Sequence, residues 1–265
     1  MTDKYFFIRA NIPIIAETAT TMKTNVTLSE FKTGLSDLLL PRRCLVCGTP
    51  LALHENHLCI DCLADMPRTG FSNRSHNQMA DRFNSLVESG NYCYATALFF
   101  YRASTGYRKI TQSLKYEADL GAGRFFSRKL GKEMAESPLY KDVDAVIPVP
   151  LHWTRRWARG YNQAEVIAGE LAAALGAQLR DDILYRARRT RSQATLSVGE
   201  KGRNVRGAFR VRRRFLRKPV SYSHILVVDD VYTTGATLYS CFLALREVFP
   251  EPVRISVATL ACVGR

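Results

Sequence analysis

Apolar residues recur with two different periods after about residue 90 of this 265-residue chain. Short, nearly continuous apolar runs such as "ILVV" at 225–228 and "ISVATLA" at 255–261 are typical of strands buried on both faces of a sheet. Longer stretches with apolar residues three and four positions apart are typical of amphipathic helices. In chain order these patterns predict strand 93–101, helices at about 105–116 and 120–136, strand 143–149, helix 161–175, an Arg-rich loop, strands 205–211 and 224–229, helix 235–248 and strand 252–260.

This alternation of strands and helices predicts an α/β fold in which helices cover both faces of a parallel sheet. We expect the α/β domain to span residues 91–265. The polar stretch "TGFSNRSHNQMADRFNS" at 69–85 resembles a linker or loop, and it places a boundary between about residues 70 and 90. Residues 1–36 carry little periodicity. We expect a disordered extension there, or an artefact of the start site ahead of Met22.

The hydrophobic content, 46% of residues, is sufficient for a sizeable core. No apolar run approaches the roughly 18 residues that span a bilayer. The run "IPIIA" near the N-terminus is shorter than a secretory core of about 7–15 apolar residues. We therefore expect a cytoplasmic protein without a membrane span, and the sequence does not indicate its oligomeric state.

Four cysteines form two C-x-x-C pairs near the N-terminal side of the predicted boundary: Cys44, Cys47, Cys59 and Cys62. Each pair lets a tight turn direct two thiolates at one ion, so the spacing predicts a tetrahedral site for structural Zn²⁺ in a ribbon at 37–70. A disulfide pair does not suit a reducing cytosol, and a redox dithiol needs only one such pair. We expect the ribbon and the larger domain to have separate cores, so that chelation of zinc leaves the larger domain folded.

Two histidines and three further cysteines are the remaining candidate metal ligands near or beyond the pairs. His54 and His57 could each replace a thiolate, but four cysteines already complete the coordination of zinc. We therefore interpret both histidines as polar residues of the ribbon's hairpin. The other cysteines lie in apolar contexts and are expected to be buried as small apolar side chains: Cys93, Cys241 and Cys262.

Charge is unevenly distributed along the chain. Lys and Arg number 38 against 24 Asp and Glu, which gives a net charge of +14, and residues 186–218 alone hold 13 of the cations and one Glu. A positive surface raises the local concentration of an anionic partner, such as a phosphorylated small molecule or nucleic acid. The alternative is a solvated loop whose charge serves only solubility.

The stretch "VVDDVYTTGAT" at 227–237 places two acids, Asp229 and Asp230, where the strand is expected to end. A helix is expected to begin near Ala236, and the free N–H groups and dipole of its first turn favour an anion. Gly235 allows the backbone to approach a phosphate. Three threonines add hydroxyl donors to this turn: Thr233, Thr234 and Thr237.

The two carboxylates do not suit a phosphate, but they can accept hydrogen bonds from the vicinal hydroxyls of an attached sugar. The stretch therefore predicts a site for a phosphorylated ribose. The alternative is structural, because Asp and Thr also cap helices that bind no ligand.

The same eleven residues resemble the phosphoribosyl pyrophosphate (PRPP) loop of type I phosphoribosyltransferases. From about residue 37 to its C-terminus, the chain resembles the ComF/GntX family, in which a double zinc ribbon precedes a type I phosphoribosyltransferase domain. Besides the loop, the matching segments are "LLLPRRCLVCG" at 38–48, "LKY" at 114–116, "IPVPLHWTRRWARGYNQAE" at 147–165 and "RSQATLSVGEKGRNVRGAF" at 191–209.

The resemblance implies a type I phosphoribosyltransferase fold that binds PRPP together with Mg²⁺. Asp229 and Asp230 would be the catalytic acids that hold the ribose hydroxyls at the mouth of the site. The rest of the loop would bind PRPP: Val231, Tyr232, Thr233, Thr234, Gly235, Ala236 and Thr237.

Two further segments match loops that contact pyrophosphate in the family. A pyrophosphate loop is implied at Arg155, Arg156, Arg159 and Gly160. The alternative for this segment is an exposed basic loop on which Trp153 and Trp157 pack. A mobile loop that closes over the substrate is implied at Arg188, Arg191, Gln193, Lys201, Arg203 and Asn204.

The chain departs from the family pattern at two positions, which weakens the roles assigned to them. Lys201 stands where the family often has Arg, so the charge is kept while a bidentate contact is in doubt. Ala118 stands where the family has Gly, which leaves the turn after "LKY" without an assigned role.

The resemblance implies three alternative functions, and the sequence does not distinguish among them. The chain could be a transferase that displaces pyrophosphate from PRPP with a nitrogen nucleophile in nucleotide metabolism, although no residue identifies the acceptor. It could be a non-catalytic competence factor that binds single-stranded DNA within the DNA-uptake machinery, because ComF relatives are associated with natural transformation and GntX relatives with gluconate utilisation. It could also be a regulator that senses PRPP without turning it over.

Overall fold

The computed structural model describes residues 41–87, 90–101, 106–117, 119–187, 207–217 and 220–264. The predicted extension at 1–36 and the predicted mobile-loop residues at 188–204 lie outside this part of the chain. The described elements are, in order, α2 (Ile60–Ala64), η1 (Phe71–Asn73), α3 (Gln78–Asn84), β1 (Ala95–Tyr101), α4 (Arg108–Gln112), the π-helical turn η2 (Ser113–Glu117), α5 (Leu120–Ala135), β2 (Ala145–Pro148), α6 (Trp153–Arg159), α7 (Gln163–Leu175), β3 (Gln178–Leu179), β4 (Leu184–Arg186), β5 (Phe209–Val211), α9 (Arg213–Arg217), β6 (His224–Tyr232), α10 (Ala236–Arg246) and β7 (Arg254–Val263).

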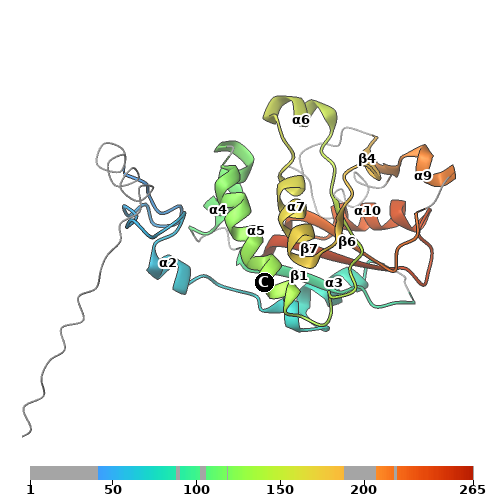
Figure 1. The fold of residues 1–265 in the computed structure, drawn as a ribbon, viewed down its shortest axis with the longest axis horizontal. Coiled ribbons are helices and arrows are strands. Elements are labelled where there is room, and N and C mark those ends of the chain that lie inside the picture. The colour runs from blue at the N-terminus through green and yellow to red at the C-terminus, as the bar shows by residue number, and fades with distance from the viewer. Residues whose placement is uncertain are drawn as a thin grey trace, which may run out of the picture. The chain divides into compact units, whose positions relative to one another are not determined.

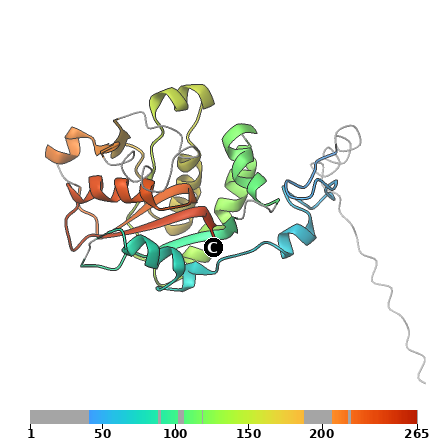
Figure 2. The same ribbon diagram turned by 180° about the vertical axis from the view of Figure 1, so that it is seen from behind.

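The main sheet has five strands in the order β1-β7-β6-β2-β3, and all of its pairings are parallel. A separate antiparallel pair is formed by β4 and β5. Helices α5 and α7 lie on one side of the main sheet (Figure 1), and α3 and α10 lie on the other (Figure 2). The predicted fold class, a parallel sheet flanked by helices with a small N-terminal ribbon, is confirmed.

The core is divided by the sheet into two layers, and the central strand β6 contributes to both. Ile225 and Val227 are buried in the layer that includes α3 and α10, whereas Leu226 and Val228 are buried in the layer that includes α5 and α7. This alternation follows from the period of two along a strand. It explains why "ILVV" is apolar at every position.

Helix α3 lies in the segment that the sequence predicted to be a linker or loop, so that prediction is wrong for this part. Asn77 begins the helix, because its side-chain oxygen accepts hydrogen bonds from the N–H groups of Met79 and Ala80. Met79, Ala80 and Phe83 are fully buried in the α10 layer. Three apolar residues at helical spacing thus anchor a segment whose composition is otherwise polar.

The ribbon is joined to the α/β part by packing and by hydrogen bonds along one edge of the sheet. The N–H of Phe100 donates to the carbonyl of Pro67 (2.8 Å), and the N–H of Thr69 donates to the carbonyl of Leu98 (3.2 Å). These bonds cover the outer edge of β1, which would otherwise present unpaired backbone groups.

The buried side chains of the ribbon belong to the same apolar cluster as the α5 layer. Cys44 and Leu58 of the ribbon share this cluster with Leu98 of β1 and Phe126 of α5. The expectation of two separate cores is therefore wrong. The physical reason is size: a ribbon of about 30 residues cannot bury much apolar surface by itself, so its inner face packs on the neighbouring helices.

The longest described helix, α5, has 16 residues. Within the described ranges, no helix is both long enough and apolar enough to cross a bilayer.

Candidate functional site

The acidic pair lies inside strand β6 and not after its end. The strand continues to Tyr232 because β7 keeps pairing with it, with Asp229 opposite Thr259 and Tyr232 opposite Cys262. On the other side, β2 ends at Pro148, which pairs with Val228. The last part of β6 is therefore paired with a strand on one side only. Ligands of α/β proteins bind at the carboxyl ends of the strands.

The two acids are neighbours in sequence but extend toward opposite layers of the fold. Asp230 continues the alternation of Leu226 and Val228, and its carboxylate meets Lys115 of η2. Asp229 continues the alternation of Val227 and extends toward α10. Burial is the main cause of the raised pKa of the Cys241 thiol there, and the charge of Asp229 is the second cause. We expected both acids to be exposed at the mouth of the site, but each is partly buried.

Lys115 is a site residue to which the sequence assigned no role. Its Nζ lies 2.7 Å from Oδ2 of Asp230, and the exposed fractions of the two side chains are 29% and 13%. Burial lowers the pKa of Lys115, but the carboxylates of Asp230 and Asp229 outweigh it and hold the pKa above its ordinary value. The signal was the motif "LKY", whose partner could not be known before the fold brought η2 beside β6.

The electrostatics of Asp229 differ from those of its neighbour. Burial, followed by repulsion from the Asp230 carboxylate, raises the pKa of Asp229, while Lys115 and Arg186 act in the opposite direction. Oδ1 of Asp229 accepts a hydrogen bond from the N–H of Asp230 at 2.9 Å. The site therefore holds one carboxylate paired with a cation and a second that readily takes up a proton.

Helix α10 begins at Ala236, as predicted, and neither acid caps it. Its N-cap is Gly235, where no side-chain cap hydrogen bond is formed. The N–H of Ala236 donates a long hydrogen bond to Oγ1 of Thr234 at 3.5 Å. Asp229 and Asp230 are instead occupied with a backbone N–H and with Lys115. The alternative that the acids serve only as helix caps is therefore wrong.

The turn before α10 requires glycine for two independent reasons. Gly235 has φ +78°, in the left-handed region that favours glycine. A Cβ at this position would lie 2.7 Å from Oη of Tyr232 and 3.1 Å from Cδ1 of Leu86. The Tyr232 side chain, only 1% exposed, cannot easily move away, and its hydroxyl has no hydrogen-bond partner among the described residues.

Replacing Gly235 with Ala should destabilise the protein by about 2–4 kcal/mol, because left-handed strain and a buried clash add together. Gly176→Ala is the matched control, since Gly176 has φ +66° but nothing within 4 Å of an added Cβ. The control should therefore cost only about 1 kcal/mol. Chemical denaturation of both variants measures the difference, and equal losses would show that Tyr232 yields to the added methyl group.

The predicted pyrophosphate loop is a short helix, α6, so the expectation of a loop is wrong. His152 precedes the helix, and Gly160 ends it in the left-handed conformation with φ +80°. Arg156 forms an ion pair with Glu165 at 2.8 Å. The charge of Arg159 acts weakly on Lys115 and lowers its pKa. The side chain of Arg155 lies outside the described residues.

The two tryptophans of α6 face solvent. Trp153 is 72% exposed and Trp157 is 88% exposed, so the alternative that they pack onto a basic loop is wrong. They lie four residues apart and therefore on one side of the helix. Large apolar surface on a cationic helix is typical of an interaction site.

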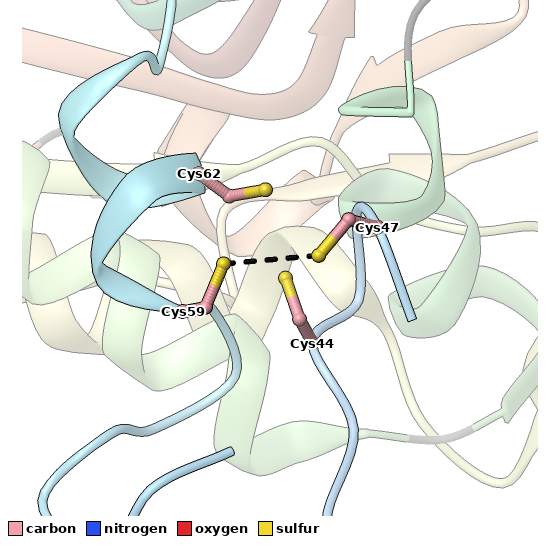
Figure 3. A group of neighbouring side chains, drawn as sticks. All are labelled: Cys44, Cys47, Cys59 and Cys62. Atoms are coloured by element: carbon pink, nitrogen blue, oxygen red, sulfur yellow. Dashed lines mark hydrogen bonds between the residues drawn. The ribbon is translucent and has the colours of Figure 1, made fainter. Parts of the chain in front are cut away.

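The four ribbon cysteines converge on one point from two turns. Cys44 and Cys47 lie in one turn, and Cys59 and Cys62 lie at the start of α2 (Figure 3). All four Sγ atoms lie within 4.8 Å of one another, and those of Cys47 and Cys59 are 3.7 Å apart. Tetrahedral zinc with Zn–S bonds of about 2.3 Å requires sulfur atoms about 3.8 Å apart, so the donor set fits zinc.

Neither histidine of the ribbon joins this cluster in the described part of the chain. His57 lies instead against the α/β part, with Nδ1 3.6 Å from Oδ2 of Asp119. The three remaining cysteines are buried free thiols, as predicted: Cys93, Cys241 and Cys262.

Comparison with known proteins identifies the ribbon and several relatives that match most of the chain. Residues 35–96 match the model of the double zinc ribbon domain. The chain is 39% identical over 218 residues to the DNA utilization protein YhgH of Salmonella typhimurium, covering 76% of this chain and 89% of that protein. It is 26% identical over 220 residues to Competence protein F of Haemophilus influenzae, covering 80% and 94%, and 26% identical over 229 residues to Competence protein ComFC of Streptococcus pneumoniae, covering 80% and 97%.

A solved structure, an orotate phosphoribosyltransferase from Aeropyrum pernix, aligns at 16% identity with a TM-score of 0.30 and covers 69% of this chain and 81% of that one. This score is too low to support any conclusion. The identity and coverage of the full-length relatives, together with the ribbon, decide the assignment. The chain belongs to the ComF family.

Proposed function

We propose that the chain binds PRPP with Mg²⁺ at the carboxyl end of β6. The observation that carries this proposal is the continuous run from the acidic pair in β6 through Gly235 into the first turn of α10. Carboxylates that suit ribose hydroxyls and a helix N-terminus that favours phosphate thus follow each other closely along the chain, which supports the proposal.

Each part of the ligand has residues of suitable chemistry. The 5′-phosphate is bound by residues 233–237 at the start of α10. Asp229 and Asp230 accept hydrogen bonds from the ribose hydroxyls, and the ion pair with Lys115 holds the Asp230 carboxylate in position. Arg156 and Arg159 of α6 face the pyrophosphate. Mg²⁺, which prefers oxygen ligands and commonly binds through substrate phosphates, is brought by the ligand because Lys115 already neutralises Asp230.

The site supports a transferase that releases pyrophosphate, and equally a sensor that binds PRPP without reaction. Calorimetric titration with PRPP, with and without Mg²⁺, tests the binding. Release of pyrophosphate in the presence of candidate nitrogen acceptors then separates the transferase from the sensor. An absence of heat at millimolar PRPP with Mg²⁺ would contradict the proposal.

A link to DNA uptake is a second candidate function, and one specific observation favours it. Relatives of this chain carry the names competence protein and DNA utilization protein. Helix α6 presents Trp153 and Trp157 to solvent beside the exposed guanidinium of Arg156. Exposed aromatic rings among cations are the arrangement on which single-stranded DNA stacks its bases. Of the cationic stretch at 186–218, residues 188–206 and 218 lie outside the described residues.

The two tryptophans of α6 are the only ones in the sequence, so their emission reports directly on this helix. Oligo(dT) should quench the emission, and added salt should reverse the effect because phosphate contacts release counterions. Trp153→Ala with Trp157→Ala should weaken binding of a labelled oligonucleotide at least about tenfold, since stacking is worth about 1–3 kcal/mol per base.

Two matched variants accompany this experiment. Trp153→Phe with Trp157→Phe should restore most of the affinity, because phenylalanine also stacks. Leu243→Ala, at another exposed apolar position, should leave the affinity unchanged. Unaltered tryptophan emission at a saturating concentration of oligonucleotide would exclude α6 as the binding surface.

A further inference from the structure

One short segment contacts both the zinc site and the acidic pair. Residues 106–117, which include α4 and η2, follow β1 and lie on the ribbon side of α5 (Figure 1). The hydroxyl of Tyr107 donates a hydrogen bond to the carbonyl of the zinc ligand Cys62 at 2.8 Å. The ammonium of Lys109 donates to the carbonyl of Val46 at 3.1 Å. The segment is therefore bonded to both cysteine turns of the ribbon.

The approach between this segment and the ribbon is too close for a larger residue. A Cβ on Gly106 would lie 2.8 Å from the carbonyl oxygen of Val46 and 2.8 Å from its Cγ1. Real Cβ atoms do not come this close to a backbone oxygen, so the contact depends on glycine. Val46 lies between the ligands Cys44 and Cys47. The turn that carries these two ligands therefore fixes the position of the Val46 carbonyl.

The far end of the same segment reaches the candidate ligand site. Lys115 meets Asp230 at 2.7 Å. The preceding carbonyl, that of Leu114, accepts a hydrogen bond from Nε2 of Gln163 at 3.2 Å and another from the hydroxyl of Tyr161. Both donors follow α6, so the segment is tied to the pyrophosphate side of the site as well.

We propose that the zinc ribbon positions Lys115 against the acidic pair, so that zinc in the four-cysteine site sets the affinity of the β6–α10 site for its anionic ligand. This inference rests on the proposed function and assigns it a means of regulation. Without zinc, the turns that hold the carbonyls of Cys62 and Val46 lose their geometry. The segment then loses the hydrogen bonds of Tyr107 and Lys109, and Lys115 is no longer held beside Asp230. An anionic ligand is then repelled by two carboxylates that no cation offsets.

The test separates the ribbon contact from the metal itself. Tyr107→Phe with Lys109→Met removes both hydrogen bonds to the ribbon but leaves all four cysteines and the ligand site intact. This variant should retain zinc in metal analysis, yet it should bind PRPP with Mg²⁺ about 5- to 20-fold more weakly by calorimetry. Lys115→Met should weaken binding by at least as much. The triple variant should be no weaker than Lys115→Met, because both changes act through one residue.

A merely structural role for Tyr107 and Lys109 would give independent losses that add in the triple variant, and this outcome would overturn the inference. Equal affinities of the wild type and the Tyr107→Phe, Lys109→Met variant would also overturn it, while leaving the proposed function in place. An absence of PRPP binding by the wild type would overturn both. Tyr101→Phe, a change in a neighbouring tyrosine of β1, is the control and should bind PRPP like the wild type.

Discussion

Replacing Asp229 and Asp230 together with Asn should abolish PRPP binding in a chain that remains folded. Asn has nearly the same size as Asp but lacks the charge and half of the acceptor capacity. Hydrogen bonds to ionised acceptors contribute about 1.5–3 kcal/mol each, so at pH 8, above the raised pKa of Asp229, loss of both corresponds to at least about 100-fold in affinity. Calorimetry with PRPP and Mg²⁺ measures the effect.

The chain contains a second adjacent pair of acids that serves as the control. Asp181 and Asp182 precede β4, and Asp182 is paired with Arg180 at 2.9 Å. Changing both to Asn should cost some stability and leave PRPP affinity unchanged. If the Asp229 and Asp230 double variant kept its affinity in a folded chain, the assignment of the ribose site would be refuted.

The single variants of the acidic pair should differ in stability, and pH should reveal why. The pKa of Asp229 is raised in the folded chain, mainly by burial, so the folded state holds a proton that the unfolded state has lost. Stability therefore falls as pH rises from about 4 toward the raised pKa. Asp229→Asn carries no titrating carboxyl at this position, so it does not lose this free energy of unfolding as pH rises. Its Tm at pH 8 should exceed that of the wild type by about 2–4 °C for each kcal/mol that the wild type has lost. The advantage should disappear near pH 4.

Asp230→Asn should behave in the opposite way, because it leaves Lys115 without the carboxylate that holds its charge. An unpaired cation in a mostly buried position costs more than the hydrogen bond it has lost. Scanning calorimetry of both single variants at pH 5 and pH 8 distinguishes them. Equal shifts in Tm would contradict the different surroundings of the two acids.

Cys44→Ser or Cys62→Ser should reduce zinc content from about one ion per chain to near zero and destabilise the whole described unit. Removing one ligand leaves three thiolates around the ion, and binding of structural zinc is itself part of the folding free energy. Because Cys44 shares an apolar cluster with Leu98 and Phe126, the loss should spread beyond the ribbon. Metal analysis and thermal unfolding measure the two effects.

Cys93→Ala is the matched control for the zinc variants, since Cys93 is a buried thiol outside the four-cysteine cluster. It should keep its zinc while losing a little stability through the small cavity it leaves. Limited proteolysis adds a second measurement. If the Cys62→Ser variant were cleaved in the ribbon but kept the wild-type Tm, the α/β part would not depend on the shared cluster.

The long elements could be predicted from the sequence because their patterns are strong. Helices α5 and α7 have regular apolar spacing, and β6 and β7 are nearly continuous apolar runs. Helix α3 was missed because tertiary burial of Met79 and Phe83, and not composition, fixes it. Helix α6 was missed because its large apolar residues, Trp153 and Trp157, face solvent. Its sequence therefore lacks the apolar periodicity of a helix with a buried face.

The candidate site was predictable only where its residues are contiguous. The acids, threonines and glycine of 227–237 lie together in sequence, and the cysteine pairs carry their own spacing. The end of β6 was misplaced because continued pairing with β7, which no local pattern shows, carries the strand past Asp229. Lys115 lies 115 positions before its partner Asp230 in sequence. The two side chains meet only because η2 packs beside β6, so the pair could not be predicted from the sequence.

The strip of backbone at Pro67–Thr69 has a consequence for how the protein can be divided. Because these residues hydrogen-bond along the outer side of β1, a fragment that starts after them would present an open strand edge. The same cut would uncover apolar side chains of the cluster that Leu58 and Met66 now cover. An open edge beside apolar surface is a template for pairing between chains, so the isolated α/β fragment is expected to aggregate. Solubility therefore depends on keeping the ribbon and the sheet in one polypeptide.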